Sequence, residues 1–211
     1  MTEPWLERWE EGRIGWHEPD GNANLKKHWP DLPKGSRVLV PLCGKSYDLI
    51  WLADLGLNVT GIELSAIAVE AFFDEHKLEY DAVIDGDTQR YRSNARPITI
   101  FCGDYFDFVS RPFDALFDRA ALVAMPADQR PRYVEHTKAL LKQDAYRLIV
   151  TLEYDQAIVN GPPFAMLPDE LKSYWDDVCL LGRQNAIDNC PPKFKGAGLT
   201  EVVEAAWSSR R

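Results

Sequence analysis

The feature that most constrains the fold of this sequence is a regular alternation of short β-rich runs with segments of helical periodicity. Strand-like apolar runs occupy residues 37–41, 58–62, 97–102, 113–117 and 146–152. Segments whose apolar residues recur at helical spacing separate several of these runs, at 46–55, after residue 65 and at 128–141. Strands joined by such helices form right-handed βαβ units. The sequence therefore predicts a doubly wound α/β fold with a largely parallel sheet covered on both faces.

Several residues mark where the predicted elements begin and end. Ser65 is suited to N-cap the helix after the second strand, and Gly56 to end the helix before that strand. Asp128 is predicted to cap a helix with Pro131 in its first turn. Residues 80–97 are polar and turn-forming, which predicts a hairpin or an excursion. The C-terminal part predicts a helix at 167–175 and late strands at 178–181 and 200–207.

Length and composition favour one soluble domain over 1–211, because no repeat or linker divides the chain. The longest apolar runs, 148–152 and 120–125, are far shorter than the roughly 20 residues of a membrane span. The acidic first eleven residues do not resemble a targeting peptide. A net charge of −9 argues against nucleic acid as a partner. We therefore expect a cytoplasmic monomer that acts on a small molecule.

Cysteine and histidine spacing gives no sign of a disulfide framework or a metal site. The cysteines contain no C-x-x-C pair, and Cys43 and Cys102 lie at the ends of strand-like runs as small apolar residues would. The four histidines lack metal-ligand spacing. We expect free thiols and no metal.

The loop after the first strand, residues 41–46, is the expected ligand site, because ligands bind beyond the carboxyl ends of parallel strands. It lacks the G-x-G-x-x-G spacing of dinucleotide sites, which argues against an NAD-dependent dehydrogenase. It matches the tail of a P-loop, but the upstream glycine of that motif would fall at Leu39. Gly44 allows the backbone to turn close to a ligand, although an ordinary βα turn is an equal alternative.

Glu63 ends the second strand, at about the 20-residue distance from the loop glycine where an acidic residue binds ribose hydroxyls. With Gly44 it suggests a cofactor that contains adenosine; the alternative is a structural strand-ending glutamate. Asp104 and Tyr105 follow the third strand and are placed to border an adenine ring. Arg119 ends the fourth strand. It is suited to bind a cofactor carboxylate or an anionic substrate, or to pair with the nearby Asp118 or Asp114.

Three tryptophans lie in the first sixteen residues. Trp5 and Trp9 share one face of a short predicted helix over residues 3–11, and Trp16 follows two glycines. This helix either fastens the N-terminus to the core or acts as a lid that covers a cationic cofactor with aromatic rings and excludes water.

Six motifs together resemble the thiopurine S-methyltransferases in their bacterial form: Trp5-x-x-x-Trp9, Gly15-Trp16-His17, Arg37-Val-Leu-Val-Pro-Leu-Cys-Gly-Lys-Ser46, Gly61-Ile-Glu-Leu-Ser65, Phe113-Asp-x-x-x-Asp-Arg119-Ala-x-Leu122 and Gly161-Pro-Pro-Phe164. The similarity runs collinearly from about Trp5 to Phe164. It implies a Rossmann-like, seven-stranded sheet whose last strand is antiparallel, with residues 1–30 as a helical cover over the site.

The resemblance also implies a cofactor, S-adenosyl-L-methionine, and its contacts. Trp9, Leu42, Glu63 and Arg119 match cofactor-contacting positions of that family, and Trp5, Asp104 and Tyr105 match further ones. Trp16 matches an aromatic position that borders the substrate pocket. The chain departs from some relatives by lacking a second arginine in residues 188–195, where only Lys193 and Lys195 are cationic.

The implied reaction is methyl transfer to a thiol sulfur, with Arg119 orienting or stabilising an anionic substrate and no side-chain nucleophile. Methylation of inorganic selenium or tellurium species, or of other small thiols, is the main alternative. A non-catalytic S-adenosylmethionine-binding regulator is a more distant one. A DNA amino-methyltransferase is disfavoured, because residues 160–164 interrupt the motif it needs with Gly161 and follow the fifth strand rather than the fourth.

Overall fold

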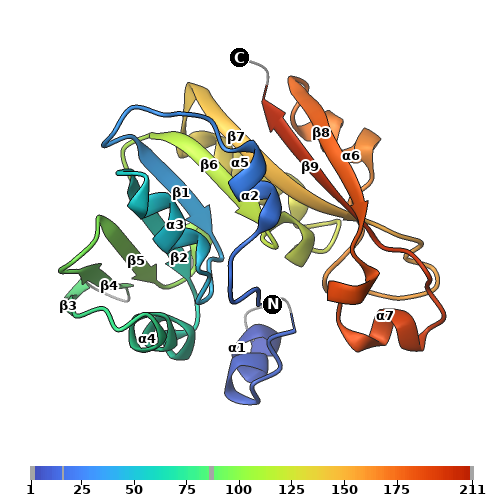
Figure 1. Ribbon diagram of the computed structural model, residues 1–211, viewed down its shortest axis with the longest axis horizontal. Helices are drawn as coiled ribbons and strands as arrows, with labels where there is room; N and C mark the ends of the chain where they lie inside the picture. Colours follow the sequence, from blue (N-terminus) through green and yellow to red (C-terminus); the bar gives the residue numbers. More distant parts are fainter. Residues whose placement is uncertain (1–2, 16, 86–87, 210–211) are drawn as a thin grey trace.

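The computed structural model describes residues 3–15, 17–85 and 88–209. Nine strands form one sheet in this part of the chain: β1 Arg37–Pro41, β2 Asn58–Glu63, β3 Tyr80–Asp85, β4 Thr88–Ser93, β5 Ile98–Cys102, β6 Phe113–Arg119, β7 Leu141–Glu153, β8 Val178–Asn185 and β9 Val203–Ser209. Their order across the sheet is β3-β4-β5-β2-β1-β6-β7-β9-β8 (Figure 1).

The centre of the sheet is parallel, as predicted. β1 pairs in parallel with β2 and β6, β2 with β5, and β6 with β7. β9, the last strand of the chain, is antiparallel to both β7 and β8, which also agrees with the prediction. The strand order reverses direction at β1, whose two neighbours are β2 and β6, and this switch point is where such sheets bind ligands.

The predicted number of seven strands was wrong, because the hairpin of β3 and β4 joins the sheet. β4 pairs in antiparallel fashion with β5 and so adds two strands beyond the parallel core. Aromatic packing holds the hairpin in place: the rings of Tyr80 and Tyr91 lie 4.5 and 6.2 Å from that of Phe73. Polar residues on the open face of this hairpin had suggested an excursion from the sheet.

Seven α-helices are described: α1 Glu3–Glu10, α2 Ala23–His28, α3 Asp48–Asp54, α4 Ala66–Glu75, α5 Arg130–Ala139, α6 Pro168–Tyr174 and α7 Pro192–Gly196. Side-chain alternation along the strands sorts them onto the two faces. On β1, Val38 and Val40 pack in the cluster that contains α2, α3 and α4 residues, whereas Leu39 packs in the cluster that contains α5 and α6 residues. A third cluster lies around Phe194 of α7.

Helix boundaries agree with one predicted cap and not with the other. The Ser65 hydroxyl accepts a hydrogen bond from the N–H of Ala68 at 3.3 Å and caps α4 as expected. The prediction for α5 was wrong: Gln129 occupies the N-cap position and makes no side-chain capping bond. With Pro131 near the start of the helix, one backbone donor is already absent.

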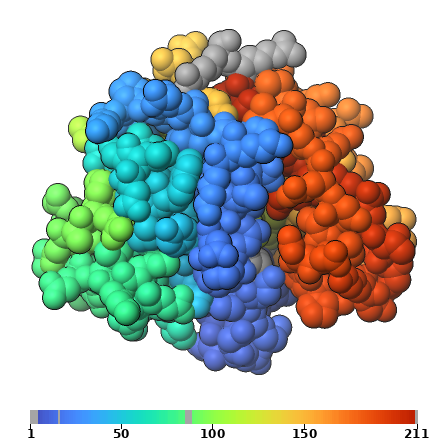
Figure 2. Space-filling view, viewed as in Figure 1, coloured from blue at the N-terminus to red at the C-terminus, as the bar shows by residue number. Residues whose placement is uncertain are grey.

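The N-terminal segment crosses the molecule outside the sheet. Figure 1 shows α1 beyond the end of the sheet toward which β1 and β6 point, and α2 against the sheet itself. In Figure 2 this segment runs down the middle of the visible face, between α3 on one side and the C-terminal elements on the other. None of the described helices is long and apolar enough to cross a membrane.

Candidate functional site

The candidate site lies where the loops after β1, β2, β5 and β6 meet. Three residues in these loops have positive φ angles: Leu42 (47°), Gly44 (52°) and Ala120 (70°). Leu42 and Ala120 carry a Cβ, so their left-handed backbone costs free energy that the surrounding structure must offset. Such conformations concentrate at binding sites.

Position 44 requires a glycine because the loop contacts α1 closely at this point. A Cβ built on Gly44 would lie 3.1 Å from Cζ2 of the Trp9 indole, and its positive φ is also unfavourable for other residues. Trp9 is 8% exposed, so its ring is packed against the loop after β1. The glycine predicted from the sequence thus lets α1 close over the carboxyl end of the sheet.

Glu63 joins the first two loops. Its Oε2 accepts a hydrogen bond from the N–H of Gly44 and its Oε1 from the N–H of Ser65, both at 2.8 Å. Burial raises the pKa of Glu63, and these backbone donors oppose the rise. A carboxylate offers about four lone-pair directions, so with backbone donors from Gly44, Leu64 and Ser65 it keeps acceptor capacity for a further donor.

Two connected cavities lie beside these residues. A central cavity, with about 660 Å³ of empty space including its opening to solvent, is lined by Trp5, Trp9, Leu42, Gly44, Glu63, Leu64, Ala120, Ala124 and Pro163. An outer cavity, with about 1100 Å³ of empty space including solvent, shares Trp5, Leu42, Leu64 and Ala124 with it and extends to Asp104, Tyr105, Phe106 and Arg132. The structure therefore brings every predicted cofactor-binding residue except Arg119 to these two cavities, and Arg119 lines a neighbouring pocket.

Asp104 and Tyr105 both line the outer cavity, but their polar atoms differ in availability. Asp104 is exposed and accepts a hydrogen bond from the N–H of Phe106 at 2.9 Å, at the start of the 3-10 helix η1, Tyr105–Asp107. Tyr105 is buried, and its hydroxyl lies 2.9 Å from that of Thr137. Burial raises the pKa of Tyr105, which therefore stays a neutral phenol.

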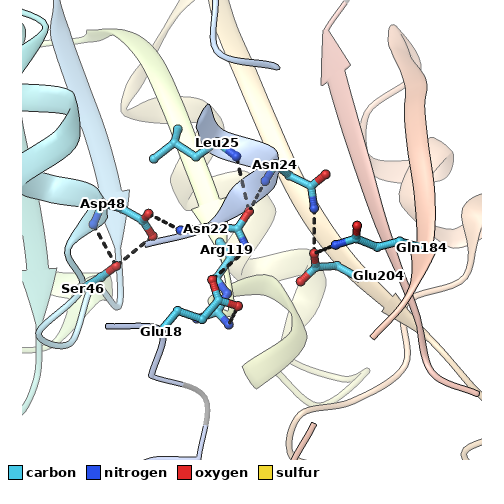
Figure 3. A network of polar contacts seen from close by, with 9 residues as sticks. All are labelled: Glu18, Asn22, Asn24, Leu25, Ser46, Asp48, Arg119, Gln184 and Glu204. Atoms are coloured by element: carbon cyan, nitrogen blue, oxygen red, sulfur yellow. Dashed lines mark hydrogen bonds and ion pairs between the residues drawn. The ribbon is translucent and has the colours of Figure 1, made fainter. Parts of the chain in front are cut away.

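Arg119 is the last residue of β6, and its guanidinium Nη2 donates to Oε1 of Glu18 at 2.6 Å (Figure 3). Neither of the carboxylates considered from the sequence is this partner. Asp118 is buried and accepts from Leu122 N–H (3.0 Å) and Tyr133 O–H (2.7 Å), and burial raises its pKa to about 6. Asp114 accepts from the N–H of Arg37 and from Lys142.

The region around Arg119 also forms a pocket of its own, with about 500 Å³ of empty space including its opening to solvent, which we call the Arg119 pocket. Its lining includes Glu18, Arg119, Val123, Val150, Leu152 and Glu204. Ala120 and Pro163 line both this pocket and the central cavity, so the two adjoin. A ligand in the central cavity can therefore meet a second molecule in the Arg119 pocket.

A polar network orders the N-terminal segment around this pocket (Figure 3). Asn22 N–H donates to Asp48 at 2.7 Å, and its side-chain amide donates to Glu18 at 3.1 Å. The Asn24 amide donates to Oε1 of Glu204 at 2.6 Å, across 180 residues of sequence. Burial raises the pKa of Glu204, while Arg119 opposes that rise. The network ties the segment before α2 to α3, β6 and β9.

The sequence did not identify Glu18 or Glu204 as site residues. It also did not settle whether Lys193 or Lys195 takes the place of a second arginine. Lys193 donates to the carbonyl oxygens of Asn160 and Pro162, each at 2.8 Å, and Lys195 pairs with Asp188. All of β9 after Val203 is buried, so the signal for Glu204 was a charged residue within a buried strand. Trp16, the predicted substrate contact, lies outside the described residues.

The cysteines and histidines show no ligand cluster within the described residues. All four cysteines are free, and Cys43 and Cys102 are buried as predicted. Burial raises the pKa of Cys190, which lines the Arg119 pocket, to about 11, so its thiol stays protonated. Among described residues, no group of three or more His, Cys, Asp or Glu side chains is arranged to hold a metal ion.

Solved structures share this fold. The 1,6-didemethyltoxoflavin-N1-methyltransferase of Burkholderia thailandensis, solved with S-adenosylhomocysteine, superposes with a TM-score of 0.63 at 17% identity, over 100% of this chain and 87% of that one. An arsenic(III) S-adenosylmethionine methyltransferase of Chlamydomonas reinhardtii gives 0.59 at 14% identity, over 91% and 71%. The chain thus has the Rossmann-like fold of the S-adenosylmethionine-dependent methyltransferases.

Sequence comparison narrows this class to one family. Residues 1–211 match the model of the family described as Thiopurine S-methyltransferase (TPMT). The thiopurine S-methyltransferase of Photobacterium profundum is 44% identical over 98% of this chain and 97% of its own length. That of Bordetella petrii is also 44% identical, over 100% and 98%. The chain belongs to the thiopurine S-methyltransferase family, as its motifs indicated.

Proposed function

We propose that this protein transfers the methyl group of S-adenosylmethionine to the sulfur of aromatic or heterocyclic thiols such as thiopurines. The observation that carries this proposal is the buried Glu63 carboxylate, fixed by the Gly44 N–H beneath Trp9 and directed into a cavity that adjoins the Arg119 pocket. This arrangement gives two adjacent compartments, one for a nucleoside cofactor and one for an acceptor.

The lining residues fit the proposed cofactor. Glu63 retains acceptor capacity for a ribose hydroxyl, because its three backbone donors, Gly44, Leu64 and Ser65, leave part of the carboxylate lone pairs unused. Asp104 and Tyr105 border the outer cavity at the predicted adenine end. Trp9, Leu42 and Gly44 supply the surface beside the reacting end, and an indole face stabilises a cation such as a sulfonium. Trp5 covers both cavities.

When bound, the cofactor supplies an electrophilic methyl group. The substrate thiolate attacks this methyl carbon in line; the new S–C bond forms as the old one breaks, and its electron pair stays on the departing sulfur, giving S-adenosylhomocysteine. A thiolate is already a strong nucleophile, so the protein need not provide one. The residues around the two compartments accelerate the reaction by alignment and by exclusion of water.

Arg119 and the N-terminal segment are assigned to positioning. Arg119 lines the acceptor pocket next to Ala120, which lines both compartments, and it orients the cofactor carboxylate or the anionic sulfur of the substrate. Residues 1–30 act as a cover. The acidic charge of −9 favours a small-molecule thiol over nucleic acid as partner, and we propose a cytoplasmic monomer.

The direct test combines binding with turnover. S-adenosylmethionine and S-adenosylhomocysteine should each raise the thermal unfolding midpoint, because a ligand that binds only the folded state stabilises it. Formation of S-adenosylhomocysteine should then depend on an added thiol, assayed with thiopurines, simple aromatic thiols, selenite and tellurite. No shift with either nucleoside would overturn the proposal. Turnover of selenite or tellurite alone would move the function to that alternative, and binding without any turnover would indicate a regulator.

Gly44→Ala is expected to weaken S-adenosylmethionine binding about tenfold, a cost of about 1.4 kcal/mol. The added methyl meets the Trp9 indole and disfavours the positive φ that directs the Gly44 N–H to Glu63. Isothermal titration calorimetry measures the change. Gly196→Ala is a matched control, since a Cβ there meets no atom within 4 Å; equal effects of the two changes would contradict the role of Gly44.

A further inference from the structure

The charges that line the Arg119 pocket do not balance. Val123, Val150 and Leu152 supply apolar wall, while the charged side chains are Glu18, Arg119 and Glu204. Two carboxylates therefore face one guanidinium. The lysines of the C-terminal segment do not line the pocket: the ammonium of Lys193 is bound to two backbone carbonyls, and that of Lys195 to Asp188.

The first carboxylate, Glu18, is held against the only arginine of the pocket lining. Oε1 accepts from Arg119 at 2.6 Å and Oε2 accepts from the Asn22 amide at 3.1 Å, so both oxygens are fixed (Figure 3). The two side chains are mostly buried, with 18% of Arg119 and 29% of Glu18 exposed. An anionic group that approaches Arg119 must therefore displace Glu18 or share the guanidinium with it, and either costs binding free energy.

The second carboxylate, Glu204, is buried and faces the pocket. The amides of Asn24 (2.6 Å) and Gln184 (3.0 Å) donate to Oε1, and the Asn22 amide also interacts with the carboxylate. A carboxylate offers about four lone-pair directions, so Glu204 keeps acceptor capacity for a ligand that carries an N–H group.

We propose that Glu18 and Glu204 make this pocket selective for thiols whose ring is neutral or carries an N–H donor, and that they exclude aromatic thiols bearing a carboxylate. This inference rests on the proposed function and adds the charge class of its acceptor. A ring carboxylate meets two like charges in a partly buried space, where Coulomb repulsion is weakly screened. A ring N–H or amino group is instead attracted to Glu204 and can donate a hydrogen bond to it.

The test uses three matched acceptors, 4-mercaptobenzoate, thiophenol and 4-aminothiophenol, assayed at pH 8 with saturating S-adenosylmethionine. Because their thiols differ in intrinsic reactivity, the quantity to compare is a double ratio: kcat/KM for 4-mercaptobenzoate over that for 4-aminothiophenol, in Glu18→Gln relative to wild type. Intrinsic reactivity cancels in this ratio. Removing one carboxylate is expected to raise it about tenfold.

Two further variants make the result decisive. Asp20→Asn removes the same charge two residues away, on an exposed side chain outside the pocket lining, and should leave the double ratio near one. Glu204→Gln should raise the ratio in the same direction as Glu18→Gln, and it supplies the test if that variant does not fold.

The outcomes distinguish a failure of charge selection from a failure of the proposed function. Turnover of the neutral thiols with a double ratio that stays within twofold of one in both glutamate variants would overturn charge selection and leave the proposed function intact. Failure of the wild-type protein to methylate any of the three would instead contradict the proposed function.

Discussion

Replacement of Arg119 by alanine is expected to lower kcat/KM for a thiopurine by about 100-fold, or about 2.7 kcal/mol of transition-state stabilisation. Arg119 is the cation in the Arg119 pocket lining, so its loss leaves Glu18 and Glu204 facing the incoming thiolate without compensation. The same change removes a planar donor from the wall of the Arg119 pocket. Steady-state kinetics with the thiopurine varied at saturating S-adenosylmethionine measure the effect.

The structure also predicts that Arg119→Ala folds. Glu18, its ion-pair partner, is 29% exposed and keeps the hydrogen bond from the Asn22 amide, so water and that amide can solvate the carboxylate left behind. Urea unfolding should therefore remain cooperative. Arg119→Lys keeps the charge but not the two-pronged geometry, and we expect it to fall between wild type and alanine. A twofold loss in the alanine variant would remove Arg119 from the proposed machinery.

Glu63 and Gly44 could be predicted from the sequence because their roles depend on local spacing. A strand followed by a tight turn fixes where the loop glycine falls, and the next strand places an acidic residue about 20 positions on. The structure then joins these two residues by a 2.8 Å hydrogen bond. The Ser65 cap was predictable for the same reason, since an N-cap acts within three residues of itself.

The acidic residues of the Arg119 pocket could not be predicted, because their partners are distant in sequence. Glu18 is separated from Arg119 by 101 residues, and Glu204 from Asn24 by 180. No periodicity or motif in the sequence indicates such distant pairs. The sequence pointed instead to Asp118 and Asp114, which are adjacent to Arg119 or on the same strand, whereas the fold gives those carboxylates other donors.

The predicted number of strands was wrong for a different physical reason. A hairpin between 80 and 97 was anticipated, but its attachment depends on whether an edge strand finds a partner. Tyr91 pairs with Ile100 across β4 and β5 and buries its ring beside Phe73. Its neighbours along β4 are polar because only one face of the hairpin is covered, and a half-covered strand gives a weak sequence signal.

Removal of residues 1–16 is expected to lower methyl transfer by at least about 100-fold while the α/β body remains folded. Trp5 and Trp9 line the central cavity, and Trp5 also lines the outer one, so the deletion opens both to water. None of the described residues of α1 belongs to the three hydrophobic clusters that hold the sheet and its helices together. Glu18, Asn22 and α2 remain in the shortened chain.

Circular dichroism and urea unfolding should confirm that the shortened protein folds, and calorimetry should show weakened S-adenosylmethionine binding alongside the lost turnover. The point variant Trp9→Ala should reproduce much of this loss, since its indole is the group packed on Gly44. Trp9→Phe, which keeps an aromatic face, should restore part of it. A shortened protein that keeps more than about a third of wild-type kcat/KM, well short of the loss expected above, would show that these tryptophans only fasten the N-terminus to the core.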